Sequence, residues 1–172
     1  MGLSMTANNT SRKKGFPPSI DNNTKVLIFG TFPGEESLRK KQYYGNTNNK
    51  FWKLLGEVVN EDLVNMEYEL RLKTILKHNI GMWDIIESCD RTGSSDNKIV
   101  NETLNDFSNL NKFESLNVLC FNGKNQEKYL KKHKLVLSER FKIITLSSSS
   151  PANARMTFDE KLKNWKTIIE FI

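Results

Sequence analysis

The chain has 172 residues, of which 37% are hydrophobic and 27% are charged, and this length and balance predict one compact domain. Its two cysteines and two histidines argue against a zinc site, a histidine-rich metal centre or a Ser-His-Asp triad. The net charge of +6 favours a polyanionic partner, nucleic acid above all, although a genome biased towards lysine and asparagine would give the same charge.

The first 14 residues are polar and end in Arg12, Lys13 and Lys14. This composition predicts a disordered basic tail over residues 1–14 and a single folded domain over residues 15–172. The tail lacks the apolar core of a secretory signal, and no apolar run approaches the roughly 20 residues of a membrane span. We therefore expect an intracellular protein, cytoplasmic in a prokaryote or nuclear in a eukaryote, that does not act at a membrane.

The first half of the domain opens with an apolar run at residues 25–30 that ends in Gly30. Such a run is typical of a strand buried on both faces of a parallel sheet. A loop is expected to follow, and apolar residues at helical spacing then predict helices near residues 51–59 and 68–76. Residues 80–86 form a short apolar segment that fits either a strand end or an ordered loop.

The second half continues the alternation of helices and strands. Helices are expected near residues 100–107 and 124–132, and strands at 116–121 and 141–146. A capping box, Thr157-x-x-Glu160, predicts the start of a last helix. The apolar face of this helix is expected to consist of Phe158, Leu162, Trp165, Ile169 and Ile172.

Strands that alternate with helices predict an α/β fold in which a parallel sheet is covered on both faces. Ligands bind to such sheets at the carboxyl ends of the strands. We therefore expect the rim of a site at four segments, residues 31–45, 87–97, 122–124 and 147–155.

Two parts of the first segment have a composition suited to binding. The run Gly30-Thr31-Phe32-Pro33-Gly34 suits a backbone that approaches a ligand closely, but it also suits a simple tight turn. The paired Tyr43 and Tyr44 beside an asparagine-rich turn could form a stacking platform for a base. The alternative is structural, because Phe51 and Trp52 open a helix and Asn48 could be its N-cap.

Several motifs taken together resemble the uracil-DNA glycosylase superfamily, and most closely its hypoxanthine-DNA glycosylase branch. The resemblance runs in order from about Gly15 to the C-terminus. The motifs are Gly30-Thr31-Phe32-Pro33-Gly34, Ser37-Leu38, Tyr43-Tyr44, Asn49-x-Phe51-Trp52, Gly81-x-Trp83-Asp84, Cys89-x-Arg91-x-Gly93-Ser94-Ser95-Asp96, Phe121-Asn122-Gly123 and Ser148-Ser149-Ser150-Pro151-Ala152-Asn153-Ala154.

The resemblance implies a three-layer α/β/α sandwich around a central, mainly parallel four-stranded sheet. It also implies hydrolysis of the N-glycosidic bond of a deaminated base, without a metal or cofactor. Such an enzyme extrudes the target nucleotide, stacks its base and stabilises the charge that develops as the bond breaks.

The resemblance also assigns site residues. Phe32 stands where many superfamily members carry a water-activating Asp or Asn, and a phenyl ring cannot do acid-base work. In the branch resembled here the polar catalytic role belongs to the asparagine of Asn-x-Phe-Trp, which is Asn49. The base pocket is expected to comprise Gly30, Thr31, Phe32, Pro33, Gly34, Tyr44, Asp84 and Asn122, with Tyr44 as the stacking aromatic.

The loop after the last strand matches the superfamily motif that enters the DNA minor groove. Its expected DNA-binding residues are Ser148, Ser149, Ser150, Pro151, Ala152, Asn153 and Arg155. The related branch usually has Leu-Pro-Ser at this point, whereas this chain has Leu146-Ser147-Ser148, so we expect a less rigid loop. A plain serine-rich surface loop is the alternative.

We therefore expect a monomeric, monofunctional DNA glycosylase that removes hypoxanthine in base-excision repair. No lysine is placed by a motif to form a Schiff base, so strand cleavage is not expected. Excision of uracil or mismatched thymine on the same scaffold is one alternative. A catalytically silent nucleic-acid-binding module is another, which the phenylalanine at position 32 keeps open.

Overall fold

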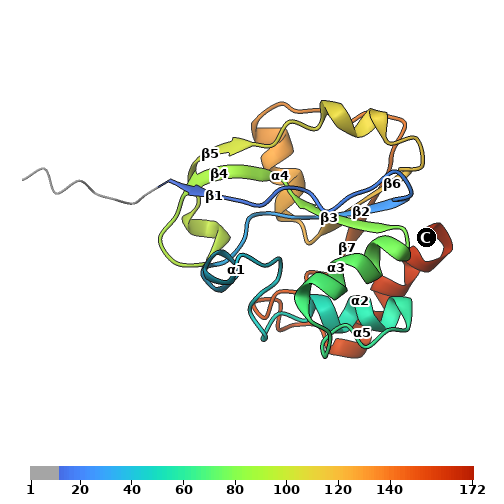
Figure 1. The fold of residues 1–172 in the computed structure, drawn as a ribbon. Coiled ribbons are helices and arrows are strands. Elements are labelled where there is room, and N and C mark those ends of the chain that lie inside the picture. The colour runs from blue at the N-terminus through green and yellow to red at the C-terminus, as the bar shows by residue number, and fades with distance from the viewer. Residues whose placement is uncertain (1–11) are drawn as a thin grey trace, which may run out of the picture.

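The computed structural model describes residues 12–172 (Figure 1). Most of the predicted N-terminal tail lies outside this range. The predicted boundary of that tail is wrong by three residues, because Lys13 and Lys14 form strand β1 (Lys13–Lys14), which pairs antiparallel with residues 88–89. Arg12 belongs to the same structure, since its guanidinium donates to the backbone oxygen of Asn101 at 2.6 Å and to Thr103 Oγ1 at 2.7 Å.

The centre of the molecule is a four-stranded parallel sheet with the strand order β3-β2-β6-β7. Its strands are β2 (Val26–Gly30), β3 (Ile80–Asp84), β6 (Val118–Asn122) and β7 (Lys142–Leu146). All three strand pairs are parallel and in continuous register. The α/β/α class and the four-stranded sheet predicted from the sequence are confirmed, and the segment near residue 80 is a strand.

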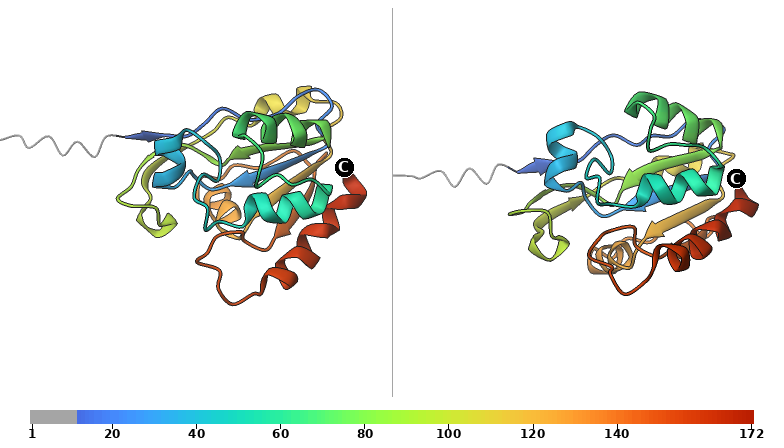
Figure 2. Two further views of the ribbon diagram at one scale, coloured as in Figure 1. Left: turned by 60° about the horizontal axis from the view of Figure 1, so that its bottom comes forward. Right: turned by 90° about the horizontal axis from the view of Figure 1, so that it is seen from below.

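Alternation along the strands explains why both faces of the sheet are covered. Val26 and Ile28 pack into one buried cluster, and Leu27 and Phe29 pack into another on the opposite face. The first cluster lies under α2 (Phe51–Val59), α3 (Tyr68–Lys77) and α5 (Phe158–Trp165). The second lies under α4 (Asn125–Lys132) and a 3-10 segment at Ser108–Lys112. Figure 2 shows α2 and α5 lying across the sheet when it is viewed from below.

A second, smaller sheet was not predicted. Strand β4 (Ile86–Asp90) pairs antiparallel with β1 and with β5 (Val100–Leu104), while a 3-10 turn at Asp96–Lys98 joins β4 to β5. The helix predicted near residues 100–107 is therefore wrong. The polar and apolar residues of this segment fit a helix locally, but pairing with β4 offers the backbone a sheet partner, and tertiary context overrides the local preference.

The loop expected after β2 contains a short helix, α1 (Glu35–Lys40), that the sequence analysis missed. The predicted capping box is confirmed, because Thr157 Oγ1 accepts from the Glu160 amide and the Glu160 carboxylate accepts from the Thr157 amide. The apolar face predicted for this last helix is partly wrong. The chain tightens into a 3-10 helix at Lys166–Phe171, whose three residues per turn bury Ile168 beneath Trp165 and leave Ile169 45% exposed.

The carboxyl ends of the parallel strands gather at one end of the molecule. In Figures 1 and 2, α1, the small sheet and the loop between β7 and α5 lie towards this end, and the C-terminus lies at the other. Within residues 12–172, no helix is both long and apolar enough to cross a membrane.

Candidate active site

Four loops meet at the carboxyl edge of the parallel sheet, as the strand topology requires. Gly30, Asp84, Asn122 and Leu146 are the last residues of β2, β3, β6 and β7. The structure therefore brings together three of the predicted base-pocket residues, and it joins them to the predicted DNA-binding loop.

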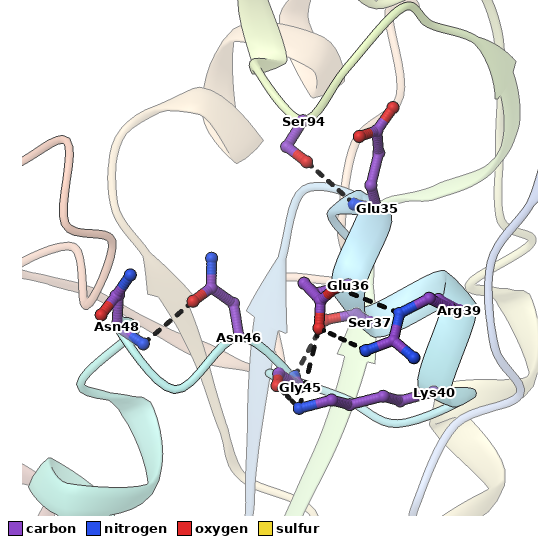
Figure 3. Close-up of polar contacts among 9 residues, drawn as sticks. All are labelled: Glu35, Glu36, Ser37, Arg39, Lys40, Gly45, Asn46, Asn48 and Ser94. Carbon is purple, nitrogen blue, oxygen red and sulfur yellow. Dashed lines mark hydrogen bonds and ion pairs between the residues drawn. The ribbon is translucent and has the colours of Figure 1, made fainter.

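Tyr44 reaches this edge from the segment between α1 and α2. Its backbone has a φ of 52°, and its ring stacks on Phe51 with the centroids 3.7 Å apart and the planes 7° from parallel. Helix α1 holds the neighbouring Gly45, whose amide donates to Ser37 Oγ at 2.9 Å and whose carbonyl accepts from Lys40 Nζ at 2.8 Å (Figure 3). Phe51 thus supports one face of a half-buried tyrosine ring.

Asn122 connects Tyr44 to the loop after β7. Its Nδ2 donates to the Tyr44 hydroxyl at 3.2 Å and to Ser149 Oγ at 2.8 Å, and its Oδ1 accepts from the Ser149 amide at 2.9 Å. Burial raises the pKa of Tyr44, to which the nearby Asp84 adds, so the hydroxyl keeps its proton. That proton is free for another acceptor because the hydroxyl accepts the bond from Asn122.

Asp84 is a buried carboxyl group at this edge, with 4% of the residue exposed. Its Oδ2 atom has no hydrogen-bond partner among residues 12–172. Burial, with a smaller contribution from the charge of Asp96, raises the pKa of Asp84 to about 7, although Arg91 opposes the shift. Asp84 can therefore exist at neutral pH either as a donor or as an acceptor.

Gly30 provides the space in which Asp84 and Tyr44 approach each other. A Cβ atom at this position would lie 2.5 Å from Asp84 Oδ1 and 2.8 Å from the Tyr44 hydroxyl. Both distances are too short for any side chain, so the two polar groups face the same point over a bare backbone.

Asn49 lies two residues before α2, whose N-cap is Lys50. Its Oδ1 accepts from the Phe51 amide, the first amide of α2, at 3.0 Å. The alternative of Asn48 as the N-cap is wrong, because Lys50 is the N-cap and the Asn48 amide donates to Asn46 Oδ1 (Figure 3). The next amide, that of Lys50, donates to the Ser149 backbone oxygen at 3.1 Å. This bond places Asn49 beside the Asn122–Ser149 contact, and its Nδ2 has no hydrogen-bond partner within residues 12–172.

The loop after β2 is fixed by residues of the loop after β4. The Phe32 side chain, expected to line the base pocket, packs instead into the second buried cluster, with the Arg91 guanidinium 5.3 Å from its ring centre. Arg91 donates to the Pro33 oxygen at 2.6 Å and to the Gly93 oxygen at 2.7 Å. Ser94 Oγ accepts from the Glu35 amide, one residue beyond Gly34, at 2.9 Å (Figure 3).

The sequence analysis missed two functional candidates in this region. Arg91 is 3% exposed, and its Nη1 has no partner in the described part of the chain. Gln126 is 1% exposed and donates to Thr31 Oγ1 at 3.3 Å and to the Asn122 oxygen at 3.2 Å. Arg91 stands in the motif Cys89-x-Arg91-x-Gly93-Ser94-Ser95-Asp96, which could have indicated its importance, but its contact with Pro33 depends on tertiary structure.

The predicted DNA-binding loop divides into an anchored and an exposed part. Ser149 is fully buried and bound to Asn122, whereas Ser148 and Ser150 Oγ accept from the amides of Ser150 and Ala152 at 3.2 Å each. Pro151, Ala152 and Arg155 are exposed, and Asn153 is half-buried. The tip of the loop, residues 151–155, therefore has no fully buried side chain.

Ser147 stands where the related branch usually has a proline, and it is bound to α5. The Ser147 amide donates to Asn164 Oδ1 at 2.7 Å, and the Ser147 oxygen accepts from Trp165 Nε1 at 2.8 Å. A proline would lack this amide, so the chain restrains the loop by hydrogen bonds at the point where the related branch uses a ring.

The residues that could hold a metal are dispersed. Among residues 12–172, no group of three or more His, Cys, Asp and Glu side chains lies in an arrangement that could bind an ion. The polar groups at or beside the carboxyl edge include the amides of Asn49 and Asn122, the Tyr44 and Ser149 hydroxyls, the Arg91 guanidinium and the buried carboxyl group of Asp84.

A parallel sheet between helical layers, with an asparagine, a tyrosine and a buried aspartate at its carboxyl edge, defines an α/β/α protein whose polar site residues gather at one edge of the sheet. The family model of the uracil DNA glycosylase superfamily matches residues 17–169. The chain belongs to this superfamily.

Relatives cover nearly the whole chain. It is 41% identical over 157 residues to a hypoxanthine DNA glycosylase of Methanosarcina acetivorans, which covers 91% of this chain and 97% of the relative. It is also 41% identical to a hypoxanthine DNA glycosylase of Methanosarcina barkeri, over 84% and 90% of the two chains. The solution NMR structure of a candidate uracil DNA glycosylase from M. acetivorans superposes with a TM-score of 0.76 at 40% identity, over 92% and 96% of the two chains.

Proposed function

We propose that this protein is a monofunctional DNA glycosylase that hydrolyses the N-glycosidic bond of hypoxanthine in DNA, as a step of base-excision repair. The observation that carries the proposal is the 41% identity to hypoxanthine DNA glycosylases over nearly their full length. The fold and the polar groups at the carboxyl edge of the sheet support it.

The extruded base stacks on the face of Tyr44 that Phe51 does not cover. Asp84 lies at the end of β3, next to β2 in the sheet, and reads the edge of the base. Hypoxanthine presents an N1–H donor beside an O6 acceptor. When Asp84 is ionised, its carboxylate accepts from N1–H, and when Asp84 is protonated, its hydroxyl donates to O6. The pKa of about 7 that burial gives Asp84 makes both forms accessible.

Asn49 acts on the reacting bond. Its Oδ1 is engaged in the bond from the Phe51 amide, and its Nδ2 group donates either to the attacking water or to the departing base. An amide is a weak base, so its contribution is orientation and charge stabilisation rather than proton abstraction. Asn122 supports this arrangement by holding Tyr44 and Ser149 in place.

The loop at residues 147–155 contacts the DNA backbone beside the extruded nucleotide. The hydroxyls of Ser148 and Ser150 and the exposed Arg155 bind phosphate oxygens, and Pro151, Ala152 and Asn153 enter the space left by the base. Ser149 anchors the loop from below through Asn122. The protein is proposed to act as a monomer on DNA that contains deaminated bases.

The test is a panel of labelled oligonucleotides that carry hypoxanthine, uracil, xanthine or a mismatched thymine, followed by alkali to cut abasic sites. Alkali-dependent cleavage at hypoxanthine is the expected result. Cleavage at uracil alone would reject the preference for hypoxanthine. It would favour excision of uracil, the activity after which the M. acetivorans structure is named. Binding without any cleavage would favour a silent DNA-binding module.

A further inference from the structure

A basic groove lies between β1 and α1, outside the proposed base pocket. It has a volume of about 390 Å³ and is lined by Arg12, Lys13, Lys14, Glu35, Leu38 and Arg39. Both walls belong to the active-site end of the molecule, because α1 follows the loop after β2 and β1 pairs with β4, which starts directly after β3 (Figure 1).

The groove keeps a small excess of positive charge after its local ion pairs are counted, which include Arg12 with Asp90 at 4.0 Å. Its four basic side chains face one lining carboxylate, Glu35, which lies 3.8 Å from Lys13 Nζ. Arg39 pairs with Glu36 at 2.9 Å on its own helix and is still 67% exposed. Lys14 is exposed and has no ion pair among residues 12–172. The groove therefore suits a partner that carries several negative charges.

The wall formed by β1 is held rigidly by the small sheet. Arg12 is bound to Ser88 Oγ at 3.2 Å as well as to Asn101 and Thr103, and Lys13 and Lys14 are in register with Cys89 and Ser88. A charged surface that is already ordered loses little conformational entropy on binding. The paired backbone fixes the positions from which Lys13 and Lys14 project.

The opposite wall is connected to the proposed site. The amide at the start of α1, that of Glu35, donates to Ser94, and Ser37 and Lys40 of the same helix hold Gly45 next to Tyr44 (Figure 3). A polyanion in the groove would therefore lie beside the proposed base pocket, on the side formed by β1 and α1. The loop at residues 147–155, which follows β7, lies at the same carboxyl edge of the sheet.

We propose that the groove between β1 and α1 binds the phosphodiester backbone of the DNA strand that flanks the target nucleotide. This inference rests on the proposed function for its choice of partner. The groove and the loop at residues 147–155 then contact the DNA on two sides of the base pocket, with Lys14 and Arg39 as the most accessible phosphate ligands.

The experiment removes two charges from the groove and two from the far end of the sheet. Lys14→Gln with Arg39→Gln is compared with Lys25→Gln and Lys77→Gln, whose side chains are exposed at the amino ends of β2 and β3. Both double variants carry the same net charge. The affinity of each for a labelled duplex of about 25 base pairs with one deoxyinosine is measured between about 50 and 200 mM salt.

The groove variant is expected to bind about tenfold more weakly, and the slope of log K against log salt is expected to fall by about 1.8, because each phosphate contact contributes about 0.9. The far-end variant should stay within about twofold of wild type. Equal losses in both variants, or no loss in the groove variant, would overturn the inference. If the groove variant binds DNA more weakly than the far-end variant, but the wild-type protein releases no base, the proposed function is rejected and this inference stands.

Discussion

At the scale of single residues, the buried Asp84 makes the stability of the fold depend on pH. A carboxyl group with an ordinary pKa of 3.8 in the unfolded chain titrates at about 7 in the native protein, chiefly because it is buried. Between these values the native state binds a proton that the unfolded state has released, so the free energy of unfolding falls as the pH rises.

Asp84→Asn removes this dependence on pH. Relative to wild type, the variant should gain up to about 1.4 kcal/mol of stability per pH unit between pH 4 and pH 7, and the difference should level off above pH 7. Urea denaturation of both proteins across this range measures it. Stability curves that run parallel from pH 4 to pH 8 would show that the carboxyl group titrates normally.

The proposal gives Asn49 two separable tasks, because Oδ1 accepts from the Phe51 amide and Nδ2 has no hydrogen-bond partner within residues 12–172. Asn49→Ala should lose about 10²–10³ in single-turnover rate and about 1 kcal/mol of stability. Asn49→Ser keeps an oxygen that can cap the helix but lacks the amide donor, so it should lose rate and retain most of the stability.

The control for Asn49 is Asn48→Ala, since the Asn48 side chain neither caps α2 nor contacts the Asn122–Ser149 pair in the hydrogen bonds of residues 12–172. It should excise at close to the wild-type rate. Melting temperatures and single-turnover rates of the three variants decide the matter. A rate defect in Asn49→Ala that Asn49→Ser fully restores would mean that the residue is only a helix cap.

At the scale of elements, the loop after β2 depends on a clamp from the loop after β4. Arg91 binds the Pro33 and Gly93 carbonyls, and Phe32, which has no polar chemistry to offer, packs against the guanidinium. This contact gives position 32 a structural purpose.

Arg91→Met tests the clamp. It leaves two carbonyls without their donor, and each is expected to cost about 1–3 kcal/mol of stability. The single-turnover rate should fall with it, because the loop at residues 31–34 loses its anchor. Ser94→Ala, which removes only the acceptor for the Glu35 amide, is the milder control at about 1 kcal/mol. Chemical denaturation that ranks Ser94→Ala below Arg91→Met in stability would contradict this account.

The elements that depend on local pattern could be predicted, and those that depend on distant partners could not. Residues 26–30 and the capping box at Thr157 reveal themselves through apolar runs and residue spacing. Strand β5 exists because β4 offers it a partner, and Ile168 is buried because the last helix tightens. Arg91 and Gln126 escaped notice for the same reason, since their partners are far away in the sequence.

At the scale of the whole molecule, the parallel sheet explains why scattered motifs form one site. Four strands end at a common edge, so residues as distant in sequence as Tyr44, Asp84, Asn122 and Ser149 come within reach of one another. The roles of these residues rested on the resemblance to a family. Their proximity follows from the sheet.

The most direct test of the account is to detect the released base itself. The protein is incubated with a deoxyinosine duplex in the presence of excess chelator, and free hypoxanthine is quantified by mass spectrometry while the strand is examined before and after alkali. The account predicts free hypoxanthine equal to the abasic sites formed, with strands that break only after alkali. Strands cut before alkali, release that requires an added divalent metal, or no free hypoxanthine would contradict a metal-independent, monofunctional glycosylase.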